Sequence, residues 1–79
     1  MLRIMLSRPH LRSRKAPAYE ARLGGELLCV SREPEFEAAR VLLARGHAPE
    51  ALMTTRWEGS SYDAILAAPL GHLAKWTVT

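Results

Sequence analysis

The chain is 79 residues long, which suits one small domain. It carries eleven Lys and Arg against eight Asp and Glu, a net charge of +3, and its aromatic residues are one Phe, two Trp and two Tyr. The single Cys excludes an internal disulfide and suits a reducing compartment, and there is no run of about 18 apolar residues that would cross a membrane. We therefore expect a cytoplasmic domain with a small core.

The positive charge is concentrated near the N-terminus. Residues 1–18 contain five cationic side chains and no acidic one, whereas the rest of the chain has six basic and eight acidic side chains, a net charge of −2. Residues 2–6 alternate in a way compatible with a short strand, but the following residues are rich in Pro and Arg and show no apolar period. We predict a basic arm or linker over residues 1–17 and a compact domain over residues 18–79, which should stay folded without the arm. The cationic residues of the arm are Arg3, Arg8, Arg12, Arg14 and Lys15.

Two alternating segments after the arm predict a β-hairpin. Residues 19–23 and 27–30 both alternate in hydropathy, and Gly24-Gly25 lies between them. A type I′ turn requires positive φ at both central residues, which glycine adopts without strain. The chain therefore enters the domain as two antiparallel strands.

Residues 31–46 predict an amphipathic helix. Ser31 can act as the N-cap, Pro34 fits the first turn, and Gly46 can supply the left-handed residue that ends the helix. Glu37 and Arg40 are one turn apart and are expected to pair on the exposed side. The opposite side is apolar, so this helix should pack on a sheet.

The C-terminal third predicts a strand, a short helix and a last strand. Residues 52–57 are rich in β-branched and aromatic side chains, and this strand should run parallel to residues 27–30 if both belong to one sheet. Ser60 or Ser61 can cap a short helix that reaches residue 66, with one further turn before Lys75, and residues 76–79 alternate as a terminal strand. The predicted fold is α+β: a single sheet of three to five strands, in the order hairpin, helix, strand, short helix, strand, with the helices packed on one face.

No catalytic, metal-binding or cofactor motif is present. His10, His47, His72 and Cys29 have no spacing typical of a metal site. Cys29 could act as a nucleophile with His47 or His72 as the base, but it lies in an apolar strand, where a cysteine usually behaves as a small hydrophobic residue. We expect no enzyme activity, no metal and no cofactor.

Two sets of residues are candidates for binding. Arg56 and Trp57 end the strand over residues 52–57, and Arg and Trp are enriched at the centres of protein interfaces, although Trp57 could instead belong to the core. The arm could neutralise phosphates of a nucleic acid, or it could be a solvated tail, because no aromatic residue for base stacking precedes Tyr19. The two sets predict different partners.

One segment of the chain carries a resemblance. The run Glu37-Ala-Ala-Arg-Val-Leu-Leu-Ala-Arg-Gly46, followed by Pro49, Arg56, Gly59 and Trp76-Thr-Val78, resembles a group of small uncharacterised bacterial and prophage proteins. The similarity leaves out the basic arm and residues 60–66. The group has no function to transfer, but its likeness to mobile-element cargo implies a small inhibitor or adaptor that acts by protein contact, similar to an anti-CRISPR protein.

Charge, motifs and resemblance together predict a non-enzymatic protein-binding module that docks on a larger protein or ribonucleoprotein complex. The alternative is a nucleic-acid-binding accessory protein that uses the basic arm. Neither hypothesis involves a membrane, and each allows a monomer or a homodimer.

Overall fold

The computed structural model describes residues 1–8 and 18–75, and over these residues it contains five strands and two helices. The strand order is β3-β2-β1-β4-β5; β1 and β4 run parallel, and the other neighbouring pairs are antiparallel. The α+β class is confirmed. In chain order the elements are β1 (Leu2–Ser7), β2 (Tyr19–Leu23), β3 (Glu26–Ser31), α1 (Pro34–Ala44), β4 (Leu52–Trp57), β5 (Asp63–Pro69) and α2 (Leu70–Leu73).

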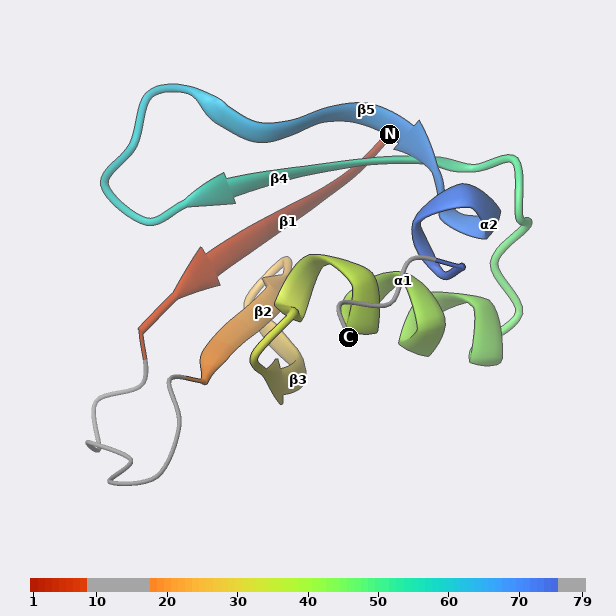
Figure 1. Ribbon diagram of the computed structural model, residues 1–79, viewed down its shortest axis with the longest axis horizontal. Coiled ribbons are helices and arrows are strands. Elements are labelled where there is room, and N and C mark those ends of the chain that lie inside the picture. Colours follow the sequence, from red (N-terminus) through yellow and green to blue (C-terminus); the bar gives the residue numbers. More distant parts are fainter. Residues whose placement is uncertain (9–17, 76–79) are drawn as a thin grey trace.

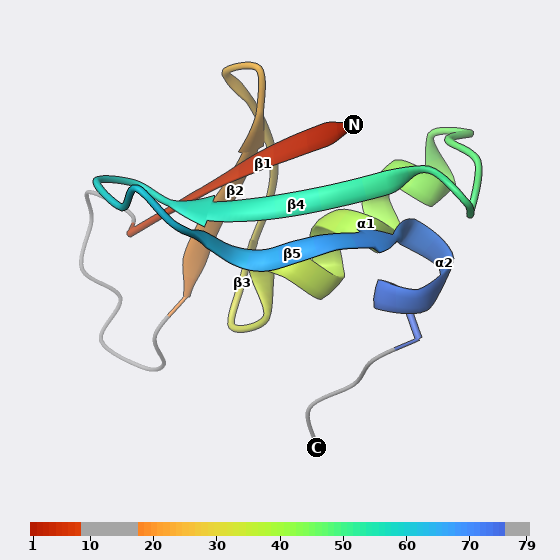
Figure 2. The same cartoon turned by 90° about the horizontal axis from the view of Figure 1, so that it is seen from above.

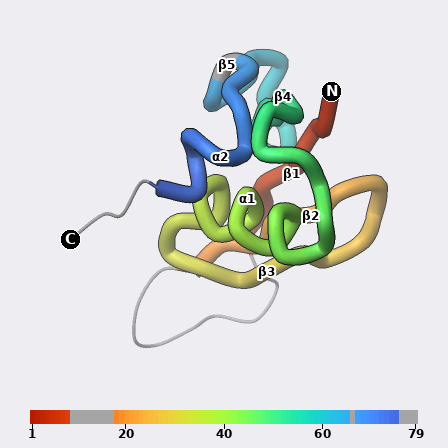
Figure 3. Tube along the Cα trace, turned by 90° about the vertical axis from the view of Figure 1, so that its right-hand side faces the viewer, coloured from red at the N-terminus to blue at the C-terminus, as the bar shows by residue number. Residues whose placement is uncertain are grey.

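Both helices lie on one face of the sheet, as predicted (Figures 1 and 2). Seen from the end, the strands form an arc around α1 (Figure 3). α1 packs against β1, β2, β3 and α2, and α2 also contacts β5. The core lies between these two layers and consists of Ile4, Leu6, Ala21, Leu28, Ala38, Ala39, Leu42, Met53, Leu70 and Leu73.

The other face of the sheet is covered by no helix of the described chain, and we call it the open face. Side chains of a strand alternate between this face and the helix side, and a register shift in the β2–β3 pairing interrupts the alternation along β3, so that Leu27 and Val30 both lie here. The residues of the open face are Arg3, Met5, Glu20, Arg22, Leu27, Val30, Leu52, Thr54, Arg56 and Asp63.

The central strand of the sheet comes from the segment that was predicted to be an arm. β1 pairs with β2 on one side, from Ile4 with Leu23 onward, and with β4 on the other. Ile4 and Leu6 are buried beneath the helices. The predicted domain boundary at residue 18 is therefore wrong for residues 2–7, because deleting them would remove the middle of the sheet. The alternation of residues 2–6 indicated this strand, but residues 1–17 were assigned to an arm because the residues that follow the strand are rich in Arg.

The predicted hairpin is confirmed. β2 and β3 pair antiparallel, and the turn between them places Gly24 at φ +57° and Gly25 at φ +88°. Both values lie in the left-handed region that a type I′ turn needs. The hairpin puts β2 next to β1 and leaves β3 at the edge of the sheet.

Helix α1 begins later than predicted. Its first residue is Pro34, with Glu33 in the cap position and no side-chain cap. Ser31 instead accepts a hydrogen bond from the backbone N–H of Glu33 at 3.1 Å, which shapes the turn that leads from β3 into the helix. Ser31 thus acts before the helix rather than as its N-cap.

The end of α1 agrees with the prediction for Gly46, which has φ +98°. The N–H of Gly46 donates to the Leu43 carbonyl at 3.0 Å, and the N–H of His47 donates to the Leu42 carbonyl at 3.1 Å. These two bonds form a Schellman motif, which satisfies carbonyls that the helix end would otherwise leave unpaired.

The segment after β4 is a strand, and the prediction of a short helix there is wrong. β4 has the predicted bounds and runs parallel to β3, with β2 and β1 between them. The expected short helix from Ser60 to residue 66 is absent, and β5 pairs antiparallel with β4 instead. The N–H of Ser60 donates to the Trp57 carbonyl, Gly59 has φ +86°, and Ser60 accepts from the Tyr62 N–H, so a tight turn uses the serine that was expected to cap a helix.

Helix α2 is the single turn expected before Lys75. It continues directly from Pro69 at the end of β5 and packs on α1. The predicted terminal strand over residues 76–79 lies outside the described residues.

A pair of alanine substitutions tests the position of β1. Ile4 is 2% exposed and Met5 is 43% exposed. Ile4→Ala should lower the free energy of unfolding by about 2–4 kcal/mol through the cavity it leaves, and Met5→Ala by less than about 1 kcal/mol. Urea denaturation followed by circular dichroism measures both. If the two variants are equally stable, residues 2–7 are not a strand with one buried face.

A buried hydroxyl provides a second test of the core. Thr55 on β4 is fully buried, and within the described part of the chain its Oγ1 has no hydrogen-bond partner. Thr55→Val replaces the hydroxyl by a methyl group of similar size, so it should raise the free energy of unfolding by about 1 kcal/mol. A loss of stability in the same urea titration would show that the hydroxyl is hydrogen-bonded in solution.

Candidate functional site: the open face of the sheet

Arg56 and Trp57, which were predicted to act together, lie on opposite faces of the sheet. Trp57 pairs with Leu6 and points to the helix side, where it packs against the core. Its ring meets that of Tyr19 edge to face, with centroids 5.0 Å apart and planes at 84°. Arg56 points to the open face and is exposed. Successive side chains of a strand always diverge in this way, so the two residues cannot form one patch.

Arg56 is instead brought together with Arg3, which was predicted to belong to the arm. In the parallel ladder of β1 and β4, Arg3 pairs with Thr54 and Met5 pairs with Arg56. Both arginines line a groove of about 190 Å3 on the open face. The other residues of this groove are Ile4, Met5, Thr54 and Asp63.

A third arginine, Arg22, completes the cluster and was not predicted as a site residue. Met5 pairs with Arg22 on β2 as well as with Arg56 on β4, so it lies between two arginines in one row across the sheet. Leu27 and Asp63 end the row on the two edge strands. The alternation of residues 19–23 indicated the side of β2 that Arg22 occupies, but only the strand order makes it a neighbour of Met5.

Two of the three arginines are held by acidic side chains. The Nε and Nη2 atoms of Arg56 lie 3.1 and 3.0 Å from the same oxygen of Asp63. Arg22 approaches Glu20 at 3.5 Å through Nη2 and donates to the Gly25 carbonyl at 3.3 Å through Nη1. Arg3 has no ion pair with any described residue. Three positive and two negative charges thus leave a charge of +1 at the centre of the open face.

Arg8, the other cationic residue of the predicted arm that the structure describes, does not join this cluster. Arg8 is exposed just beyond β1 and lines a separate open hollow of about 490 Å3 with Ser7, Trp57 and Glu58. Arg12, Arg14 and Lys15, like His10, lie outside the described residues. Within the described chain, the cationic residues predicted as a single arm therefore occupy two separate places.

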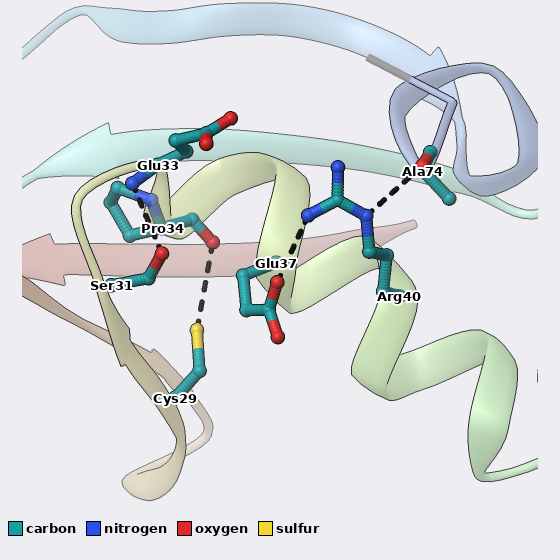
Figure 4. A network of polar contacts seen from close by, with 7 residues as sticks. All are labelled: Cys29, Ser31, Glu33, Pro34, Glu37, Arg40 and Ala74. Atoms are coloured by element: carbon teal, nitrogen blue, oxygen red, sulfur yellow. Dashed lines mark hydrogen bonds and ion pairs between the residues drawn. The ribbon is translucent and has the colours of Figure 1, made fainter. Parts of the chain in front are cut away.

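Cys29 is placed as a structural residue (Figure 4). Its Sγ lies 3.7 Å from the Pro34 carbonyl, to which the thiol donates. Burial raises the pKa of the Cys29 thiol to about 11, and the carboxylates of Glu37 and Glu35 add to the increase because they disfavour a thiolate. A nucleophilic cysteine needs the opposite shift. Over the described residues, no group of three or more His, Cys, Asp and Glu side chains converges on a point where a metal ion could bind.

Other ion pairs of the described chain hold the scaffold in place. Arg40 pairs with Glu37 at 2.9 Å, as predicted, and also donates to the Ala74 carbonyl at 3.1 Å, which ties α1 to the end of α2 (Figure 4). Arg45 joins Glu26 at 2.8 Å, and this hydrogen bond lowers the pKa of the Glu26 carboxyl. The Arg40–Ala74 hydrogen bond links α1 to α2, and the Arg45–Glu26 pair links the end of α1 to β3.

The chain matches no protein-family profile, no curated protein and no solved structure. Neither helix of the described chain is long and apolar enough to cross a membrane.

The thiol chemistry of Cys29 can be measured directly. With a pKa of about 11 against an ordinary value of 9.0, the folded protein holds about a hundredfold less thiolate near pH 8 than an unfolded chain. Alkylation by iodoacetamide should be slower by that factor in the folded state and should accelerate as the pH rises toward 11. Since the unfolded thiol loses its proton first, stability should fall between pH 9 and 11. A folded protein alkylated as fast as the same protein in urea would restore Cys29 as a candidate nucleophile.

Proposed function

We propose that this protein is a small non-enzymatic module that docks on a larger protein or complex through the open face of its sheet, and so acts as an inhibitor or adaptor. The observation that supports this proposal is the apolar content of a face without a covering helix. Met5, Leu27, Val30 and Leu52 are between 41% and 51% exposed there. Apolar side chains exposed among arginines on an uncovered face suit a protein interface, because apolar contacts and arginines are both typical of such surfaces.

The composition of the face favours a protein partner. Met and Arg are enriched in protein interfaces, and the open face has Met5 at its centre between Arg22 and Arg56. The groove of about 190 Å3 is well below the roughly 300–1,000 Å3 of a small-molecule pocket. A side chain of a partner suits this groove better than a cofactor or substrate does.

The chemistry of Cys29 is in keeping with a binding role. The raised pKa of Cys29 disfavours a thiolate, and the thiol donates to the Pro34 carbonyl rather than to an imidazole. A module of this kind would act by occupying a surface of its partner or by joining two proteins. An inhibitor and an adaptor can both act through protein contacts alone.

Affinity purification from the native cell tests the proposal through paired variants. Met5→Gln/Leu27→Gln removes two apolar side chains from the open face at nearly constant size and charge. The matched control is Tyr62→Gln, which removes an 80% exposed apolar residue from the β4–β5 turn. The wild type and the control should retain the same partner, and the open-face variant should lose it by about tenfold or more. Circular dichroism checks that all three are folded.

Two results would contradict the proposal. One is a protein partner retained equally by all three proteins, since the open face would then not bind it. The other is retention of nucleic acid alone, in a complex that nuclease and moderate salt remove, which would favour the accessory nucleic-acid-binding function.

A further inference from the structure

The open face has a charge pattern as well as an apolar one. Met5 has Arg22 beside it on β2 and Arg56 beside it on β4, and Arg3 is two residues away on its own strand. An exposed apolar residue thus has three arginines as its neighbours on the same face. This arrangement is produced by the register of three strands.

The acidic neighbours position the arginines without using all of their donors. Both Arg56 contacts with Asp63 go to a single carboxylate oxygen. A guanidinium has five N–H donors in a planar fork, so Arg56 keeps donors for a second acceptor. Arg3 has no ion pair with a described residue, and it lines the same groove as Arg56. The residues that line the groove therefore include two arginines with donors available, next to Met5 and Thr54.

From this geometry we infer that the open face recognises an acidic protein segment, in which carboxylates pair with Arg3, Arg22 and Arg56 around an apolar side chain that contacts Met5. The inference rests on the proposed function and adds the chemistry of the partner. Arginine pairs with a carboxylate through two parallel N–H bonds, which gives orientation as well as attraction. Electrostatic complementarity of this kind contributes mainly specificity and association rate.

A nucleic acid and a second copy of the chain fit the face less well. Among the described residues of the open face there is no aromatic side chain on which a base could stack. Two copies docked face to face about a twofold axis would bring arginine clusters together. An acidic protein segment needs no surface for base stacking and brings no second cluster of arginines to the interface.

Selection from a displayed library of random twelve-residue peptides on immobilised wild-type protein tests the inference. Enriched peptides should carry Asp or Glu on both sides of an apolar residue. Fluorescence anisotropy of the most enriched peptide should show that Arg3→Gln/Arg56→Gln weakens binding by about tenfold or more. The control Arg32→Gln removes an exposed arginine outside the sheet and should change the Kd by less than about twofold. Circular dichroism again checks folding.

The outcomes separate this inference from the proposed function. Enriched peptides without an excess of acid, binding unaffected by Arg3→Gln/Arg56→Gln, or no enrichment at all would overturn the acidic partner. If such non-acidic peptides still lose binding in Met5→Gln/Leu27→Gln, the open face remains a protein-binding surface. A labelled oligothymidine of twenty nucleotides is titrated in parallel, and tighter binding of it than of the peptide, lost in Arg3→Gln/Arg56→Gln, would overturn the inference in favour of nucleic acid.

Discussion

Side chains of β1 point alternately into the core and onto the open face, so the packing of the core determines which residues the open face presents. Ile4 and Leu6 point beneath the helices, where burial stabilises the fold by roughly 1.5–3 kcal/mol for each side chain. Arg3 and Met5, between them in sequence, point the other way. A slip of one residue in the pairing of β1 would bring Arg3 and Met5 to the helix side, so the packing that buries Ile4 also determines which residues surround Met5. The arginine cluster is thus held in register by the core.

The parts of the fold that sequence predicts well are those that local backbone chemistry determines. Gly24 and Gly25 allow a turn that other residues would strain, and Gly46 ends α1 for the same reason. Errors arose where pairing with distant strands outweighs local preference. Residues 63–69 contain four helix-favouring Ala and Leu residues, yet they form β5 because the turn after Trp57 returns them along β4. Segment 2–7 becomes a strand because β2 and β4 flank it.

The candidate site was predictable only in part, for the same reason. Arg56 could be selected from its residue type and its place in a strand, and Arg3 from the local charge. Their proximity could not be predicted, since it follows from the parallel pairing of β1 with β4, which are about fifty residues apart in the chain. Arg22 was overlooked because an arginine alternating with apolar residues usually marks a solvated face. Its position beside Met5 makes Arg22 part of the candidate binding site.

The central position of β1 underlies both the stability of the domain and the proposed binding face, and amide hydrogen exchange measures it most directly. The N–H groups of residues 4–6 lie in a strand with a paired neighbour on each side. In NMR-detected exchange at neutral pH they should be among the slowest in the chain, with opening free energies near that of global unfolding. Exchange at the rate of an unstructured peptide would show that residues 1–8 are an arm after all, and the arginine cluster would then not exist.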